Sequence, residues 1–151
     1  MTDWLKEVEP LTLKGQISVP YTWWAGETAT HFLNALRDEQ KLIGSRCAMC
    51  GTVFVPPRKN CGHCFVDIDD TVDVADEGVI EAFTIVHYAH PVQPVAPPFA
   101  YVLIKLDGAD VGFLHLIKKD LDKLAIGRRV KAKFRAERMA AIMDIDSFEL
   151  V

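Results

Sequence analysis

Several features are missing from this 151-residue sequence. No apolar run approaches the roughly 20 residues that a membrane-spanning helix needs. Residues 1–9 are charged and lack the apolar stretch of a secretion signal. Basic residues are not in excess, because 17 Lys and Arg stand against 21 Asp and Glu, for a net charge of −4. These absences predict a cytoplasmic protein with no membrane partner, and they argue against general attraction to nucleic acid.

Cysteine is also scarce, with four residues arranged as two C-x-x-C pairs: Cys47 and Cys50, then Cys61 and Cys64. In a reducing compartment such pairs are typical of metal ligands, and disulfides are the less favoured alternative. Each pair forms a knuckle with both thiolates directed at one centre, and two knuckles complete a tetrahedral S₄ shell. The spacing predicts a structural zinc ion, with iron as the chemical rival.

The four predicted ligands leave no cysteine free for chemistry. A closed S₄ shell has no open position for an activated water, and no thiol remains to act as a nucleophile. We therefore predict no catalytic residue in this chain. Gly51 and Gly62 are expected to supply the backbone freedom that knuckles need. His63, inside the second knuckle, is expected to be exposed rather than a ligand.

The rest of the sequence predicts a mainly β protein. Phe32, Leu33, Ala35 and Leu36 have helical spacing and predict a helix within 21–40. Short β-rich runs separated by turn signals predict a small barrel in 66–151. A Pro-rich loop is expected at 91–98 and a short helix at 118–124. The expected division is an arm and helix (1–40), a zinc ribbon (41–65) and an OB-fold (66–151).

The N-terminal region allows more than one interpretation. Residues 1–20 show no clear period, so they are expected to form an extended arm or short hairpin, with a frayed terminus as the alternative. Tyr21, Trp23 and Trp24 follow directly. We favour their docking on a partner over packing within the chain, because Trp and Tyr are common at interfaces.

The sequence from about Trp23 to Val151 resembles the small proteins that carry a rubredoxin-like zinc ribbon followed by an OB-fold, domain-of-unknown-function family 35. Phe65 departs from the family, whose members often have Gly near the end of the second knuckle. The residues that carry the resemblance are Cys47-x-x-Cys50-Gly51, Phe54-Val55-Pro56-Pro57-Arg58, Cys61-x-x-Cys64, the segments 78–84 and 98–101, and Ile126-Gly127.

This resemblance implies a role beside an enzyme. Family members accompany thiolase-fold enzymes that act on acyl-CoA, in contexts such as acetoacetyl-CoA thiolase, sterol side-chain aldolases and thiolases of anaerobic aromatic breakdown. The implied function is a non-catalytic subunit in a hetero-oligomer, which stabilises a thiolase-fold catalytic partner or completes its CoA site. The absence of a spare cysteine agrees with this, because thiolase chemistry needs a nucleophilic cysteine.

Alternating basic residues in 128–135 form the candidate cofactor-binding site. Arg129, Lys131, Lys133 and Arg135 are expected on one face of a strand, where they would meet CoA phosphates or an acidic partner. The equally weighted alternative is a solvated strand face. His87, His90 and His115 are expected to have packing or hydrogen-bonding roles.

A second class of function stays open at this point. OB-folds and zinc ribbons also occur in proteins that bind single-stranded nucleic acid. The acidic composition speaks against this alternative, as does the lack of aromatic residues interleaved with the basic run.

Overall fold

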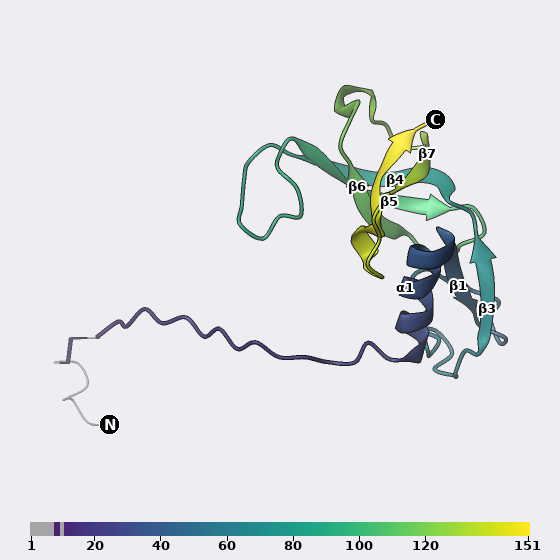
Figure 1. Cartoon of the computed structure of the whole chain (residues 1–151), viewed down its shortest axis with the longest axis horizontal. Helices are drawn as coiled ribbons and strands as arrows, with labels where there is room; N and C mark the ends of the chain where they lie inside the picture. Colours follow the sequence, from purple (N-terminus) through teal and green to yellow (C-terminus); the bar gives the residue numbers. More distant parts are fainter. Residues whose placement is uncertain (1–7, 10) are drawn as a thin grey trace.

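A computed structural model describes residues 8–9 and 11–151. Part of the predicted arm or hairpin, at 1–7 and 10, lies outside the described residues. From residue 11 to residue 26 the chain contains no helix or strand. Figure 1 shows this N-terminal segment running away from the folded part. Within the described residues, no helix is long and apolar enough to cross a membrane.

The predicted helix is confirmed as α1, Glu27–Glu39. It begins at Glu27, within the predicted starting segment 27–30, because Gly26 directly before it has a φ of 83°, outside the helical region. Phe32 and Leu36 are buried on its inner face. The Arg138 guanidinium donates to the Arg37 carbonyl at 2.7 Å. This bond ties the last turn of the helix to a loop of the barrel.

A three-stranded antiparallel sheet lies beside α1. Its central strand β1 (Leu42–Arg46) pairs with β2 (Val53–Phe54) on one side and with β3 (Asp70–Val74) on the other. Thus Val72 and Val74, which follow the second cysteine pair, join β1 and not the barrel. Asp110 connects this sheet to the barrel, since its carboxylate accepts the Val53 N–H at 2.8 Å.

Five strands form a closed barrel in the order β4-β5-β6-β8-β7, which confirms the predicted mainly β fold. β6 and β8 are parallel and the other pairs are antiparallel. The Pro-rich segment is the loop between β4 and β5, and the predicted short helix is a single 3₁₀ turn, η2. The remaining elements are β4 (Glu77–Val86), β5 (Phe99–Leu106), β6 (Phe113–Ile117), η2 (Leu121–Lys123), β7 (Arg129–Phe134), η3 (Ile142–Asp144) and β8 (Ile145–Leu150).

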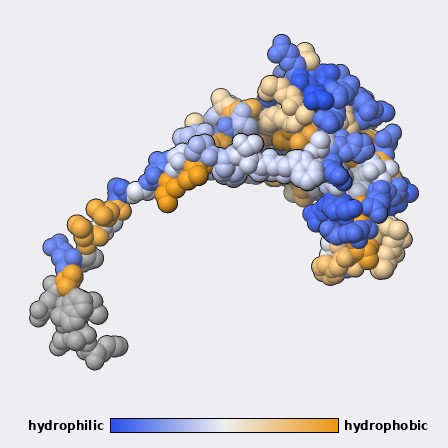
Figure 2. Space-filling model, turned by 60° about the horizontal axis from the view of Figure 1, so that its bottom comes forward, coloured by the Kyte–Doolittle hydropathy of each residue, from blue (hydrophilic) through white to orange (hydrophobic). Residues whose placement is uncertain are grey.

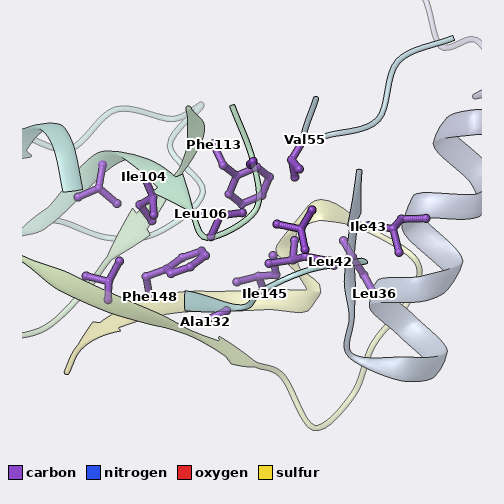
Figure 3. Packing of buried hydrophobic residues seen from close by; sticks show 14 of the residues in the cluster. Leu36, Leu42, Ile43, Val55, Ile104, Leu106, Phe113, Ala132, Ile145 and Phe148 are labelled. Carbon is purple, nitrogen blue, oxygen red and sulfur yellow. The ribbon is translucent and has the colours of Figure 1, made fainter. Parts of the chain in front are cut away.

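The helix, the sheet and the barrel share one hydrophobic core. Figure 3 shows side chains from all three converging, among them Leu36 of α1, Leu42 of β1 and Phe148 of β8. A smaller apolar cluster surrounds the cysteines and contains Phe54 and Ile68. Since strand side chains alternate between faces, Val53 and Val55 join the main core while Phe54 joins the cysteine cluster.

Candidate metal centre

The two C-x-x-C pairs fold into knuckles with the same hydrogen-bond pattern. In the first, Gly51 N–H donates to the Cys47 carbonyl at 2.8 Å. In the second, Phe65 N–H donates to the Cys61 carbonyl at 3.0 Å. The Cys61 sulfur also accepts two backbone N–H groups, from His63 and Cys64. These bonds direct both thiols of each knuckle toward one point.

The geometry of the four sulfurs fits a tetrahedral zinc ion. Their Sγ atoms all lie within 4.8 Å of one another, and those of Cys50 and Cys61 are 3.6 Å apart. Zinc–sulfur bonds of 2.3 Å in a tetrahedron place the sulfurs about 3.8 Å apart. All four cysteines are free thiols, and Cys47 and Cys61 are buried. The donor set therefore suits a structural zinc with four thiolate ligands.

In the absence of metal, the surroundings give the cysteine thiols different pKa values. Hydrogen bonds with Thr52 lower the pKa of Cys50 to about 6. Burial and the neighbouring sulfurs raise the pKa of Cys64 to about 12. A divalent ion favours all four thiolates together, so binding releases protons and becomes weaker as the pH falls.

Sequence analysis missed two polar residues that support the site. Thr52 contacts the Cys50 sulfur at 3.2 Å. The buried Ser45 hydroxyl accepts the Arg58 N–H at 2.8 Å and donates to the Arg58 carbonyl at 3.1 Å. This pair of bonds holds the Pro-Pro-Arg segment against β1. The Arg58 guanidinium then lies 5.2 Å from the centre of the Phe54 ring.

One backbone prediction needs correction. Gly51 has a φ of 76° and takes the left-handed conformation that its knuckle requires, as expected. Gly62 is not in that region, so the second knuckle does not use it for this purpose. The equivalent position is Phe65, with a φ of 59°. His63 is exposed, as predicted, with its ring centre 6.0 Å from that of Phe54.

The basic residues of β7 are paired with carboxylates. The Arg129 guanidinium lies 2.7 Å from Asp107, and Lys131 Nζ lies 2.9 Å from Glu77. Lys133 Nζ lies 2.8 Å from Glu149. Arg129, Lys131 and Lys133 are exposed on one face, whereas Arg135 lies past the end of the strand, half-buried, with Asp146 at 3.4 Å. Their positive charge is thus largely offset, and CoA binding at this face stays a prediction.

The three histidines at positions 87, 90 and 115 occupy two different environments. His87 and His90 are exposed in the loop between β4 and β5. His115 is buried between Phe113 and Phe148, and burial holds the pKa of its imidazole below the usual value. Its Nε2 lies 3.4 Å from the Ile142 carbonyl, while Nδ1 has no hydrogen-bond partner. The environment of His115 agrees with the packing role expected for it.

The Pro-rich loop contributes to a small apolar cavity on the barrel. Pro94 lines it together with Tyr101, Leu114 and Ile142, and its volume is about 110 Å³. Ligand pockets usually measure about 300–1,000 Å³, so this cavity alone is too small for an acyl-CoA.

A rubredoxin-like zinc ribbon followed by a closed OB-type barrel defines a class of two-module proteins. Residues 35–70 match the model of the ChsH2 rubredoxin-like zinc ribbon domain, and residues 71–135 match that of the ChsH2 C-terminal OB-fold domain. The chain belongs to the DUF35 family. A DUF35-family protein of unknown function from Sulfolobus solfataricus supports this with 31% identity over 72% of this chain and 77% of that one, at a TM-score of 0.58.

Curated relatives extend the comparison. A probable enoyl-CoA hydratase alpha subunit from Thermomonospora curvata is 31% identical over 93 residues, which are 61% of this chain and only 28% of the relative. A DUF35 domain-containing scaffold protein from Methanocaldococcus jannaschii is 26% identical over 66% of this chain and 72% of its own length. The structure of an Ltp2-ChsH2(DUF35) aldolase is 24% identical over 85% of this chain and 95% of that one. Its TM-score of 0.57 shows the shared fold.

Proposed function

We propose that this chain is a non-catalytic accessory subunit of an enzyme that acts on acyl-CoA, and that its partner is a thiolase-fold catalytic subunit. The observation that carries the proposal is that all four cysteines gather at one S₄ site. Thiolase chemistry needs a nucleophilic cysteine, and here each cysteine is committed to the metal. The nucleophile must therefore come from the partner.

The relatives support an acyl-CoA context. One carries the name of an enoyl-CoA hydratase subunit, one that of a scaffold protein, and one is part of an aldolase structure. A scaffold needs a rigid body, and the single core shared by the helix, the sheet and the barrel supplies one. The finer proposal is a cytoplasmic thiolase of aromatic breakdown with benzoylsuccinyl-CoA as substrate. It rests on the sequence's overall likeness to the small subunit of that enzyme.

The ion pairs of β7 weigh against the nucleic-acid alternative. Proteins that bind single strands use an open basic groove with stacked aromatic residues. Here Asp107, Glu77 and Glu149 lie within 3 Å of the strand's cations. The proposed contact with CoA at this face therefore requires phosphates to replace those carboxylates.

Co-purification tests the proposal. The full chain, tagged and expressed in its source organism, should retain a thiolase-fold subunit at fixed stoichiometry through size-exclusion chromatography. Mass spectrometry identifies that subunit, and separately purified proteins should re-form the complex. The proposal would be overturned if no thiolase-fold protein binds the pure chain, or if the chain alone turns over acyl-CoA.

A further inference from the structure

Residues 11–23 of the N-terminal segment have a period of two. The period is unclear over residues 1–20 as a whole, because residues 1–10 do not share it and it continues into the segment predicted as helix. Odd-numbered positions from 11 to 23 are apolar except for one glycine, and even-numbered positions are polar except for one proline. The odd series is Leu11, Leu13, Gly15, Ile17, Val19, Tyr21 and Trp23, and the even series is Thr12, Lys14, Gln16, Ser18, Pro20 and Thr22.

Such alternation is typical of a β-strand with one apolar face. The segment nevertheless forms no strand, and most of the surface of its apolar side chains is exposed to water. Ile17 is 90% exposed, Leu13 83% and Trp23 71%. Figure 1 shows the segment standing away from the folded part, and Figure 2 shows apolar residues along it. An apolar face of this length is unfavourable in water, so we expect it to be buried against another surface.

The folded part of this chain, as far as the structure describes it, offers no suitable sheet edge with which the segment could pair. The barrel is closed and has no free edge. In the three-stranded sheet the outer strands are β2, with two residues, and β3. β3 exposes Asp70 and Asp73, and charged residues on an edge strand discourage pairing with an apolar strand. The surface that buries the apolar face of this segment therefore lies on another protein.

We propose that residues 11–23 become a β-strand on binding the catalytic subunit, by pairing with a sheet edge next to an apolar groove. This inference rests on the proposed function and names the surface through which this chain meets its partner. In a strand, alternate residues direct their N–H and C=O groups to the same side. Pro20 has no N–H and belongs to the even series, so the odd series faces the partner's edge. The same odd residues supply the apolar face.

A comparison of the two faces tests the side-chain half of the proposal. Ile17→Ser with Val19→Ser removes two apolar anchors, and Gln16→Ser with Thr22→Ser changes two residues of the polar face. Affinity for the purified catalytic subunit is measured by isothermal titration calorimetry. The apolar-face pair should weaken binding by about 30-fold or more, as loss of buried anchors does. The polar-face pair should change it by less than about threefold.

A second comparison tests the backbone half. Gly15→Pro removes one odd N–H without removing a side chain, and Gly15→Ala keeps that N–H while adding a methyl group. Gln16→Pro removes an even N–H, which faces away from the partner in the proposed strand. Gly15→Pro should weaken binding by about tenfold or more, because a ladder bond is lost and the proline ring meets the partner strand. Gly15→Ala and Gln16→Pro should bind nearly as the unchanged chain does.

The outcomes separate this inference from the proposed function. Suppose that a catalytic subunit binds the full chain. If the apolar-face and polar-face variants then lose the same affinity, or if Gly15→Pro binds as the unchanged chain does, strand pairing is wrong. The accessory role is not affected by that result. If no thiolase-fold subunit binds the chain, both proposals fall. Self-association in sedimentation that is lost in the Ile17→Ser, Val19→Ser variant would assign the strand to a second copy of this chain and overturn the choice of partner.

Discussion

At the scale of single residues, the two knuckles differ at the position after the second cysteine. Gly51 and Phe65 both have positive φ, at 76° and 59°. Glycine adopts this conformation without penalty, whereas a side chain with a Cβ is strained by roughly 1–2 kcal/mol. Phe65 is 85% exposed, so no packing within the chain offsets that strain.

The strain predicts that Phe65→Gly strengthens the metal-bound fold. Relief of the left-handed conformation should raise the free energy of unfolding by about 1 kcal/mol, after allowance for the greater freedom of glycine when unfolded. Chemical denaturation of the zinc-loaded protein measures this. Met49→Gly serves as a comparison, because Met49 is exposed on the first knuckle and is not among the residues with positive φ. A Phe65→Gly variant no more stable than the original would contradict the strain argument.

The buried His115 makes stability depend on pH. Burial lowers its pKa from the usual 6.5, so below that pH the unfolded chain binds a proton that the folded chain does not. The free energy of unfolding should therefore fall as the pH drops from about 6.5 toward the lower pKa of the folded state.

Replacing His115 should reduce this dependence. His115→Phe keeps an aromatic ring between Phe113 and Phe148 but removes the titrating group. Denaturation of both proteins at pH 7 and pH 5.5 isolates the contribution, because any loss of metal at lower pH is common to both. Parallel pH curves for the two proteins would contradict the role assigned to His115.

Single residues also show what a sequence can predict. The four cysteines are predictable because two close local pairs are enough to define the ligands. The ion pairs of β7 are not, since Glu77 and Asp107 lie 52 and 22 residues away from Arg129. Only the folded structure shows that carboxylates from distant parts of the sequence offset the positive charge of this strand face.

At the scale of elements, the ribbon consists of two parts with different neighbours. Its strands contribute Leu42 and Val53 to the core shared with the barrel, and Val55, directly after β2, joins them. Its knuckles have only the small cluster around Phe54 and Ile68. The metal should therefore stabilise the knuckles directly and the barrel very little.

Loss of one ligand tests this division. Cys47→Ser should abolish stoichiometric zinc and unfold the knuckles, while strands β4 to β8 stay folded. Zinc analysis and hydrogen exchange measure the two parts separately. Met49→Ser, in the same knuckle but exposed, should keep its zinc. Loss of exchange protection across the barrel in the Cys47→Ser protein would contradict the division.

The proposed contact of β7 with CoA makes opposite predictions for two kinds of variant. Lys131→Ala with Lys133→Ala removes cations and should lower the affinity of the complex for CoA about tenfold, an effect that added salt should mimic. Glu77→Gln removes a carboxylate that competes for Arg129 and Lys131, so it should raise that affinity. Equilibrium binding of CoA to the assembled complex measures both. If neither variant changes the affinity, β7 is a solvated strand face.

At the scale of the molecule, sequence patterns predict the helix, the ribbon and the barrel but not how they join. Local alternation identifies β3 as a strand, yet nothing local shows that Val74 pairs with Leu42 in the ribbon sheet. The shared core brings together residues as distant in the sequence as Leu36 and Ile145. Such pairings follow from packing of the whole chain, which no short window contains.

The central claim is that this chain supplies structure and the partner supplies chemistry. The most direct measurement is acyl-CoA cleavage by a fixed amount of the purified catalytic subunit as this chain is added. The account predicts no activity from the chain alone and a rise that saturates at a fixed ratio of subunits. It also predicts loss of that activity when the partner's own nucleophilic cysteine is replaced. Full activity of the catalytic subunit without this chain, or turnover by this chain without its partner, would contradict the account.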